Sequence, residues 1–317
     1  MKAAVALSAL VTAATPALAA TYLMSESFIG EGFYDNFDFQ AIADPTHGRV
    51  NYVDQATAVA QNLTYASSDS FILRMDSTTV LDPAGPGRNS VRLRSKNTYT
   101  KHVAVINLRH MPQGCGTWPA IWETLEATWP AGGEVDILEG VNDVIPNAAT
   151  LHTSPGCTMP MVREQLGAAT QPDCDTAVNG NAGCGVKFSD QTSFGPALNA
   201  QGGGWYALER TDSFMKVWYW PRGSPNVPVG IADRNADINT DNWGTPQAFF
   251  PGDTCNIAEY FDAHNIIINL TLCGDWAGAT FNTNGCAGSC VDLANNNPGA
   301  FTEAYFDIAN IDVYTVQ

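Results

Sequence analysis

The chain has 317 residues and carries 32 acidic against 15 basic side chains, so its formal net charge is −17. A negative excess of this size argues against a nucleic acid or an anionic membrane as the partner, because both repel an acidic protein. The length allows one large domain or two small ones. No linker, internal repeat or low-complexity boundary is visible, so we expect one domain.

The first 19 residues resemble a secretory signal peptide. Lys2 precedes a short apolar run over 3–14, and Ala17-Leu18-Ala19 is a small-residue cleavage site. The run is too short to span a bilayer, and no other stretch is long and apolar enough to do so. These features predict a secreted, extracellular protein with no membrane segment, in which 20–317 form the mature domain.

Eight cysteines fit an oxidising compartment and predict four disulfides, whose pairing the sequence leaves open. A zinc site is the alternative, but the Cys286-x3-Cys290 spacing lacks a second Cys/His pair to complete it. We therefore expect no metal at the cysteines, which are Cys115, Cys157, Cys174, Cys184, Cys255, Cys273, Cys286 and Cys290.

Short segments with alternating apolar residues recur along the chain and predict β-strands. They are separated by turns rich in Gly, Pro and Asn, and 154–204 read as a long loop region with three cysteines. With few convincing helices, the pattern favours an all-β sandwich. The predicted strands include 48–53, 71–75, 90–95, 102–111, 265–272 and 305–314, with a hairpin over 205–220.

Two Asn-x-Thr sequons occur, and we expect them to differ in modification. Asn62 lies in a predicted surface turn, so it is a candidate for N-glycosylation. Asn269 lies in the most apolar predicted strand, so we expect it to stay unmodified.

Residues 132–140 read Gly-Gly-Glu-Val-Asp-Ile-Leu-Glu-Gly and place three acids in an apolar segment. Alternate side chains of a strand share a face, so Glu134 and Asp136 lie together, whereas Glu139 would face the other way. A β-bulge near Ile137-Leu138 would return Glu139 to the first face. Clustered carboxylates repel one another and cost desolvation energy, which indicates a function. The alternative is an exposed strand of solvated acids.

Paired carboxylates are typical of glycoside hydrolysis, and a retaining mechanism needs them about 5–5.5 Å apart. Glu134-Val-Asp136-Ile-Leu-Glu139 resembles the E-x-D-x-x-E signature of glycoside hydrolase family 16 in its bulged, laminarinase-type form. The segments 116–123 and 151–153 also match. The similarity runs from about residue 21 to the C-terminus and is closest to fungal endo-1,3(4)-β-glucanases. It implies a jelly roll, concanavalin A-like, with a concave sheet forming the substrate cleft.

The resemblance also implies roles for the acids. Glu134 would be the nucleophile and Glu139 the acid/base, whose pKa neighbouring negative charge should raise. Asp136 would orient Glu134 or share its proton. His152 would contact Asp136 or the substrate; the alternative is an ordinary core histidine.

Several further side chains are candidates for substrate binding. Aromatic rings cover the apolar faces of sugars, and for each tryptophan the alternative is a core role. Arg92 shares a strand face with Arg94; both could be solvated, but the resemblance favours Arg92 as a donor to sugar hydroxyls. The tryptophans are Trp118, Trp122, Trp129 and Trp276.

The resemblance implies a retaining endo-β-glucanase that hydrolyses β-1,3 and mixed β-1,3/1,4-glucans by double displacement. A cell-wall glucan transglycosylase and a non-catalytic β-glucan-binding protein are the alternatives. The expected partner is a β-glucan, and the expected state is a monomer. No cofactor is expected: Asp237-x-Asn239-x-Asp241 lacks the Gly and Glu of an EF-hand loop, which leaves only a structural calcium elsewhere open.

Overall fold

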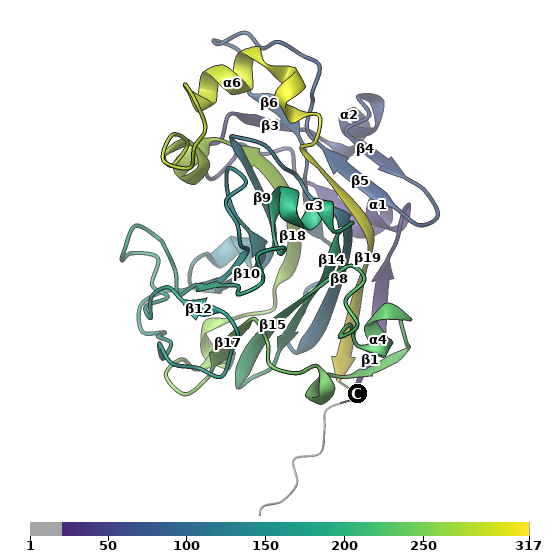
Figure 1. Cartoon of the computed structure of the whole chain (residues 1–317), viewed down its shortest axis with the longest axis vertical. Helices are drawn as coiled ribbons and strands as arrows, with labels where there is room; N and C mark the ends of the chain where they lie inside the picture. The colour runs from purple at the N-terminus through teal and green to yellow at the C-terminus, as the bar shows by residue number, and fades with distance from the viewer. Residues whose placement is uncertain (1–20, 317) are drawn as a thin grey trace, which may run out of the picture.

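The computed structural model describes residues 21–316 and has two large, mainly antiparallel sheets (Figure 1). The predicted all-β sandwich is therefore confirmed. The predicted signal peptide, 1–19, lies outside the described residues. Among those residues, no helix has both the length and the apolar character that crossing a membrane requires.

Sheet A has nine strands in the order β16-β1-β19-β8-β14-β15-β17, with β5 paired to β19 and β4 paired to β5. Its longest strand, β19, lies inside the sheet, as expected for a long alternating segment. The bounds are β1 Thr21–Phe28, β4 Thr64–Ala66, β5 Phe71–Arg74, β8 His102–His110, β14 Gly204–Arg210, β15 Phe214–Pro221, β16 Asp237–Asn239, β17 Ala248–Pro251 and β19 Tyr305–Val316.

Sheet B has eight strands in the order β12-β13-β11-β10-β9-β18-β7-β2. A short parallel pair, β3 and β6, stands apart from both sheets. The bounds are β2 Phe37–Phe39, β3 Val50–Tyr52, β6 Arg88–Ser90, β7 Arg92–Ser95, β9 Thr117–Thr124, β10 Glu134–Glu139, β11 Ala148–His152, β12 Ala168–Ala169, β13 Val186–Lys187 and β18 Asn265–Leu272.

The helices are short and lie in the connections between strands. Figure 1 shows α6 at one end of the sandwich, beside β3 and β6. Their bounds are α1 Gly32–Asn36, α2 Gln55–Ala60, η1 Glu126–Thr128, α3 Gly195–Ala200, α4 Val229–Ala232, η2 Thr240–Asn242, α5 Ile257–Tyr260, η3 Gly274–Gly278, α6 Cys290–Asn296 and η4 Pro298–Phe301.

The main core fills the space between the sheets. Val135 and Ile268 of sheet B belong to the same buried apolar cluster as Leu208 and Ile308 of sheet A. Burying both inner faces supplies the main driving force for folding. One face of each strand in sheet B is committed to this core, which leaves the opposite face for a site.

All eight cysteines are paired, so the prediction of four disulfides is confirmed. One of them, Cys174–Cys184, closes a short loop within the long loop region 154–204, and Cys157–Cys255 ties that region to a segment after β17. The other pairs are Cys115–Cys286 and Cys273–Cys290.

The two sequons differ in accessibility. Asn62 is exposed at a turn, with a left-handed φ of 55°. Asn269 is only 6% exposed, and both atoms of its amide make hydrogen bonds. Attachment of a glycan at Asn269 would break these contacts, which agrees with the expectation that it stays unmodified.

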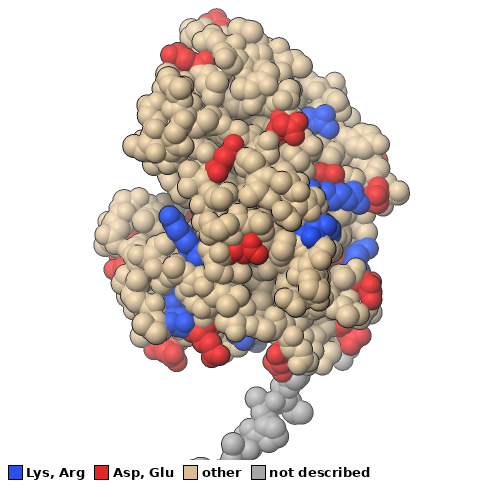
Figure 2. Space-filling view, viewed as in Figure 1, with Lys and Arg blue, Asp and Glu red and all other residues tan. Residues whose placement is uncertain are grey.

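Charged side chains are scattered over the face drawn in Figure 2, and most of that face is uncharged. The net negative charge is therefore not gathered there into one patch, nor do basic residues form a broad surface on that face.

Candidate active site

The carboxylate motif occupies β10, and its register with β9 brings all three acids to one face of sheet B. The β9 partners of Asp136 and Glu139 are two residues apart, so these two acids share a face. Glu134 lies two residues before Asp136 and joins them. The register shifts between Asp136 and Leu138, which confirms the predicted bulge.

The side chain of Asn147 holds this bulge. Its amide oxygen accepts the backbone N–H of Glu139 at 2.9 Å, and its amide nitrogen donates to the carbonyl of Ile137 at 2.9 Å. Both backbone groups lie at the shift in register, where regular ladder bonds are interrupted. Asn147 is fully buried, so no water can replace it readily.

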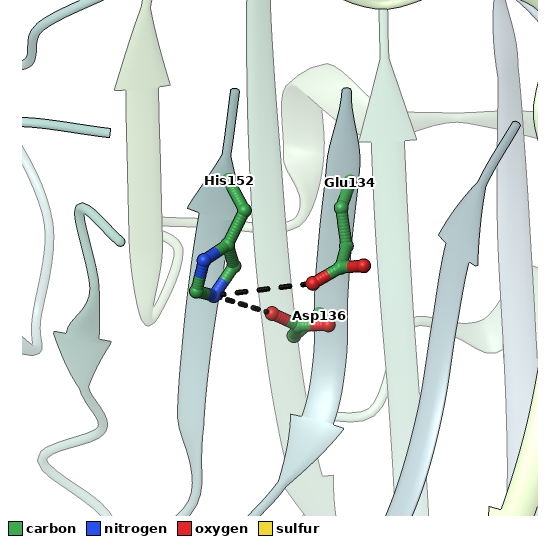
Figure 3. Close-up of side chains that lie close together, drawn as sticks. All are labelled: Glu134, Asp136 and His152. Atoms are coloured by element: carbon green, nitrogen blue, oxygen red, sulfur yellow. Dashed lines mark ion pairs between the residues drawn. The ribbon is translucent and has the colours of Figure 1, made fainter. Parts of the chain in front are cut away.

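Glu134, Asp136 and His152 point toward one another from neighbouring strands (Figure 3). Nε2 of His152 lies 3.3 Å from Oδ2 of Asp136 and 4.0 Å from Oε1 of Glu134. Asp136 is 3% exposed, and its Oδ2 receives no well-aligned hydrogen bond from any described residue. The contact with His152 is therefore mainly ionic.

Burial is the largest influence on the two glutamates. It raises the pKa of Glu134 and of Glu139, and the charge of Asp136 raises both further. This is the direction predicted for Glu139, although burial ranks before neighbouring charge. One proton is thus favoured on the pair at a pH where an ordinary carboxyl would be ionised.

His152 lies within ion-pair distance of Glu134 but not of Glu139. Burial acts to lower the pKa of His152, but the contact with Asp136 and the charges of both glutamates outweigh it and raise that pKa to about 10. Glu134 has this cation at 4.0 Å, whereas no described basic group lies within 4.0 Å of Glu139. The charge of His152 lowers the pKa of Glu139 as well, so the two glutamates differ in this close contact and not in the direction of their pKa shifts.

Each glutamate also accepts an indole N–H. Nε1 of Trp118 donates to Glu139 and Nε1 of Trp129 donates to Glu134, both at 2.9 Å. Trp129 remains 44% exposed, so its ring is open to a ligand. The sequence predicted these tryptophans as platforms for sugars and missed that they also hold the acids.

Trp276 packs edge-on against Trp118, with ring centroids 5.6 Å apart, and is 36% exposed. An open pocket of about 580 Å³ adjoins it, lined by Asp275, His47 and the Cys273–Cys290 disulfide. The exposed aromatic surface therefore continues from the acids toward this end of sheet B.

Trp122 is supported from two sides. Its indole N–H donates to Oδ1 of Asn269 at 2.7 Å, and the guanidinium of Arg92 lies over its ring, 5.0 Å from the centroid. Arg92 has a side chain only 4% exposed, and it donates to Gln40 and Glu126. Two of its donors are therefore engaged within the protein, where the side chain supports Trp122, and its direct contact with a sugar stays a prediction.

The cluster of Glu134, Asp136 and His152 places one potential donor atom of each residue within 4.8 Å of the others, a spacing that a metal ion could bridge. However, Nδ1 of His152 is hydrogen-bonded to Asn181, and its Nε2 faces two carboxylates. A protonated imidazole satisfies these contacts and has no lone pair for a metal. The spacing of these three residues therefore does not by itself require an ion.

A family model described as the XgeA-like catalytic domain of glycoside hydrolase family 16 matches residues 37–314. The chain belongs to glycoside hydrolase family 16. One relative, a probable endo-1,3(4)-beta-glucanase of Aspergillus clavatus, is 43% identical over 93% of this chain and 46% of its own length. The chain thus spans about half of that relative. A probable glycosidase of Schizosaccharomyces pombe is 40% identical over 93% of this chain and 70% of its own.

Solved structures of family 16 are similar over nearly the whole chain. Laminarinase 16A from Phanerochaete chrysosporium, with 6-O-glucosyl-laminaritriose in donor and acceptor sites, is 63% identical. It has a TM-score of 0.93 and covers 93% of this chain and 100% of its own. An elongating family 16 β-1,3-glucosyltransferase is 36% identical, with a TM-score of 0.86 and the same coverage.

The family 16 signature therefore predicted the three acids of the candidate site, but not the residues that hold them and their neighbours in place. Sequence reasoning missed Asn147, Asn181, Gln40 and Glu126, which lie in connections between predicted strands. Polar residues in such segments are common, and none of them carries a local signal of the side chain it meets. A family alignment is the kind of signal that could have found them.

Proposed function

We propose that the chain is a secreted, retaining endo-β-glucanase that hydrolyses β-1,3 and mixed β-1,3/1,4-glucans. The observation that carries this proposal is the pair Glu134 and Glu139, on one face of sheet B, each bound by an indole N–H and each with a raised pKa. The names of the fungal relatives and the glucan bound to laminarinase 16A support the substrate class.

In this mechanism Glu134 attacks the anomeric carbon while Glu139 gives its proton to the leaving glycosidic oxygen. The C–O bond to the leaving sugar breaks, and an ester forms between the sugar and Glu134. Glu139 then takes a proton from water, whose oxygen attacks the same carbon and releases Glu134. The two displacements restore the original anomeric configuration. The cation of His152 beside Glu134 is consistent with the nucleophile being the ionised member of the pair.

The remaining features of the proposal concern compartment and state. Four disulfides support an oxidising, extracellular location. We further propose a monomer that needs no cofactor and carries an N-glycan at Asn62, whose side chain is exposed.

Glutamine substitutions test the assignments. Glu134→Gln should abolish laminarin hydrolysis while the protein stays folded, and Glu139→Gln should lower kcat by about 10²–10⁴. Glu31→Gln is a matched control, because this exposed glutamate precedes α1, its side chain makes no capping hydrogen bond, and its replacement should leave the rate unchanged. Near-normal turnover in Glu134→Gln would remove it as nucleophile.

Transglycosylation is the second candidate, because the similar glucosyltransferase structure is 36% identical. The same glycosyl-enzyme would then pass its sugar to another glucan and not to water. Chromatography of laminarin products separates the two, since hydrolysis accumulates reducing ends and transfer redistributes chain lengths. A non-catalytic glucan-binding protein would not need all three acids, so we place it last.

A further inference from the structure

The loop closed by the Cys174–Cys184 disulfide lies directly on β11, around His152. The backbone N–H of Thr153 donates to the carbonyl of Cys174 at 2.8 Å, and the N–H of Cys184 donates to the carbonyl of Leu151 at 3.0 Å. The two ends of the loop are thus bonded to the residues on either side of His152, and the disulfide joins those ends.

The loop also contacts the imidazole itself. Oδ1 of Asn181 lies 2.9 Å from Nδ1 of His152. Gly183 has a left-handed φ of 58°, and a Cβ at this position would lie 2.8 Å from Cε1 of His152. Only glycine allows so close an approach without displacing the ring. Asn181 and Gly183 therefore reach the ring together.

We propose that Asn181 is a positioning residue for His152: its amide oxygen accepts the Nδ1–H and fixes the ring with Nε2 directed at Asp136 and Glu134. This inference deepens the proposed function and rests on it, because the ring acts on the reaction through Glu134. A neutral ring held in this way would turn the lone pair of Nε2 toward two carboxylates. The contact with Asn181 therefore favours the imidazolium.

The groups that face His152 come from two elements. Glu134, Asp136 and Glu139 of β10 supply negative charge, and the loop supplies the neutral amide of Asn181. Asp175 is the loop acid nearest in sequence to Cys174, and one of its oxygens accepts the backbone N–H of Ala177. Among the loop side chains, removal of the Asn181 amide should therefore change the pKa of His152.

Two substitutions at Asn181 distinguish the role of its hydrogen-bond acceptor from a purely structural role in the loop. Its φ is 61°, a left-handed value that both glycine and aspartate tolerate. Asn181→Gly removes the acceptor, and Asn181→Asp keeps it. Asn179→Gly is the matched control, because Asn179 has a similar φ of 51° in the same loop, and its amide donates to Gln171 and not to His152.

The deciding measurement is the titration of the His152 ring nitrogens by ¹⁵N NMR, with the resonance assigned from a His152→Gln variant. In Asn181→Gly the pKa of His152 should fall by about one unit, since a hydrogen bond to a charged group is strong. It should not fall in Asn181→Asp or in Asn179→Gly. An unmoved titration in Asn181→Gly, or an equal fall in Asn181→Asp, would overturn the proposal.

Kinetics on laminarin supply the second readout. Asn181→Gly should lower kcat about tenfold with little change in KM, and Asn181→Asp should recover most of it. Equal loss in both variants would point to a merely structural loop. If the unmodified protein cleaves no glucan, the proposed function fails, whereas the NMR titration still tests the role of Asn181.

Discussion

Replacing Asn147 with alanine should loosen the bulge and cost both stability and catalysis. The buried amide of Asn147 bonds the N–H of Glu139 and the carbonyl of Ile137. Alanine leaves both groups buried without a partner, and each costs about 1–3 kcal/mol, so the free energy of unfolding should fall by about 2–6 kcal/mol. If β10 straightens to recover ladder bonds, Glu139 turns away from the acids, and general-acid catalysis worth about 10²–10⁴ is lost.

Urea denaturation and two substrates measure these effects for Asn147→Ala. Laminarin has a poor leaving group and needs the acid, whereas an aryl β-laminaribioside with a good leaving group needs it little. The rate on laminarin should therefore fall far more than the rate on the aryl substrate. Asn147→Asp keeps the acceptor for Glu139 and loses the donor to Ile137, so its stability should be intermediate. A folded Asn147→Ala protein with normal kcat on laminarin would refute this account of the bulge.

Three further predictions follow from the site and its loops. Because the pKa of Glu139 is raised, the folded protein keeps this proton to higher pH than the unfolded chain does, and its stability falls as pH rises through the folded pKa. Glu139→Gln should flatten this fall in the free energy of unfolding between about pH 5 and 8, measured by urea denaturation, and an unchanged dependence of stability on pH would contradict the prediction. Trp122→Ala should raise KM for laminarin by about tenfold, and Trp122→Phe by less, since a ring remains to stack; equal KM values in all three proteins would remove Trp122 from the binding surface. The double substitution Cys174→Ser and Cys184→Ser removes the bond between loop ends that are 10 residues apart, and it should lower the free energy of unfolding by about 2–3 kcal/mol. A stability equal to that of the unmodified protein would show that packing alone holds the loop.

The strands could be predicted because alternation of apolar residues survives wherever one face is buried. The alternating segment 305–314 corresponds to β19, whereas 265–272, a nearly continuous apolar run, corresponds to β18, in which every residue is buried. Partners could not be predicted: β18 pairs with β9 and β7, both distant in sequence, and alternation specifies no partner. The segment 90–95 was expected as one strand, but β6 ends at Ser90 and β7 begins at Arg92, because the two halves join different sheets.

The bulge could be predicted because the spacing of Glu134, Asp136 and Glu139 makes sense only if one residue is inserted. The groups that stabilise it could not, because Asn147 and its partner strand meet only after the chain folds. The role of Arg92 shows the same limit. Its place on the open face was predictable from alternation, whereas its engagement by Gln40 and Glu126 depends on connections that alternation does not describe.

The geometry also explains how two similar glutamates can take different roles. Both are buried beside Asp136, which raises the pKa of each and distinguishes neither. Each also accepts one hydrogen bond from an indole N–H, so this contact does not distinguish them either. The cation of His152 lowers the pKa of both, but it distinguishes them by distance, because it lies 4.0 Å from Glu134 and makes no ion pair with Glu139. A double displacement needs one ionised and one protonated carboxyl at the same moment. Under the proposed mechanism, the different roles of the two glutamates therefore depend on a residue of β11, outside the acidic motif.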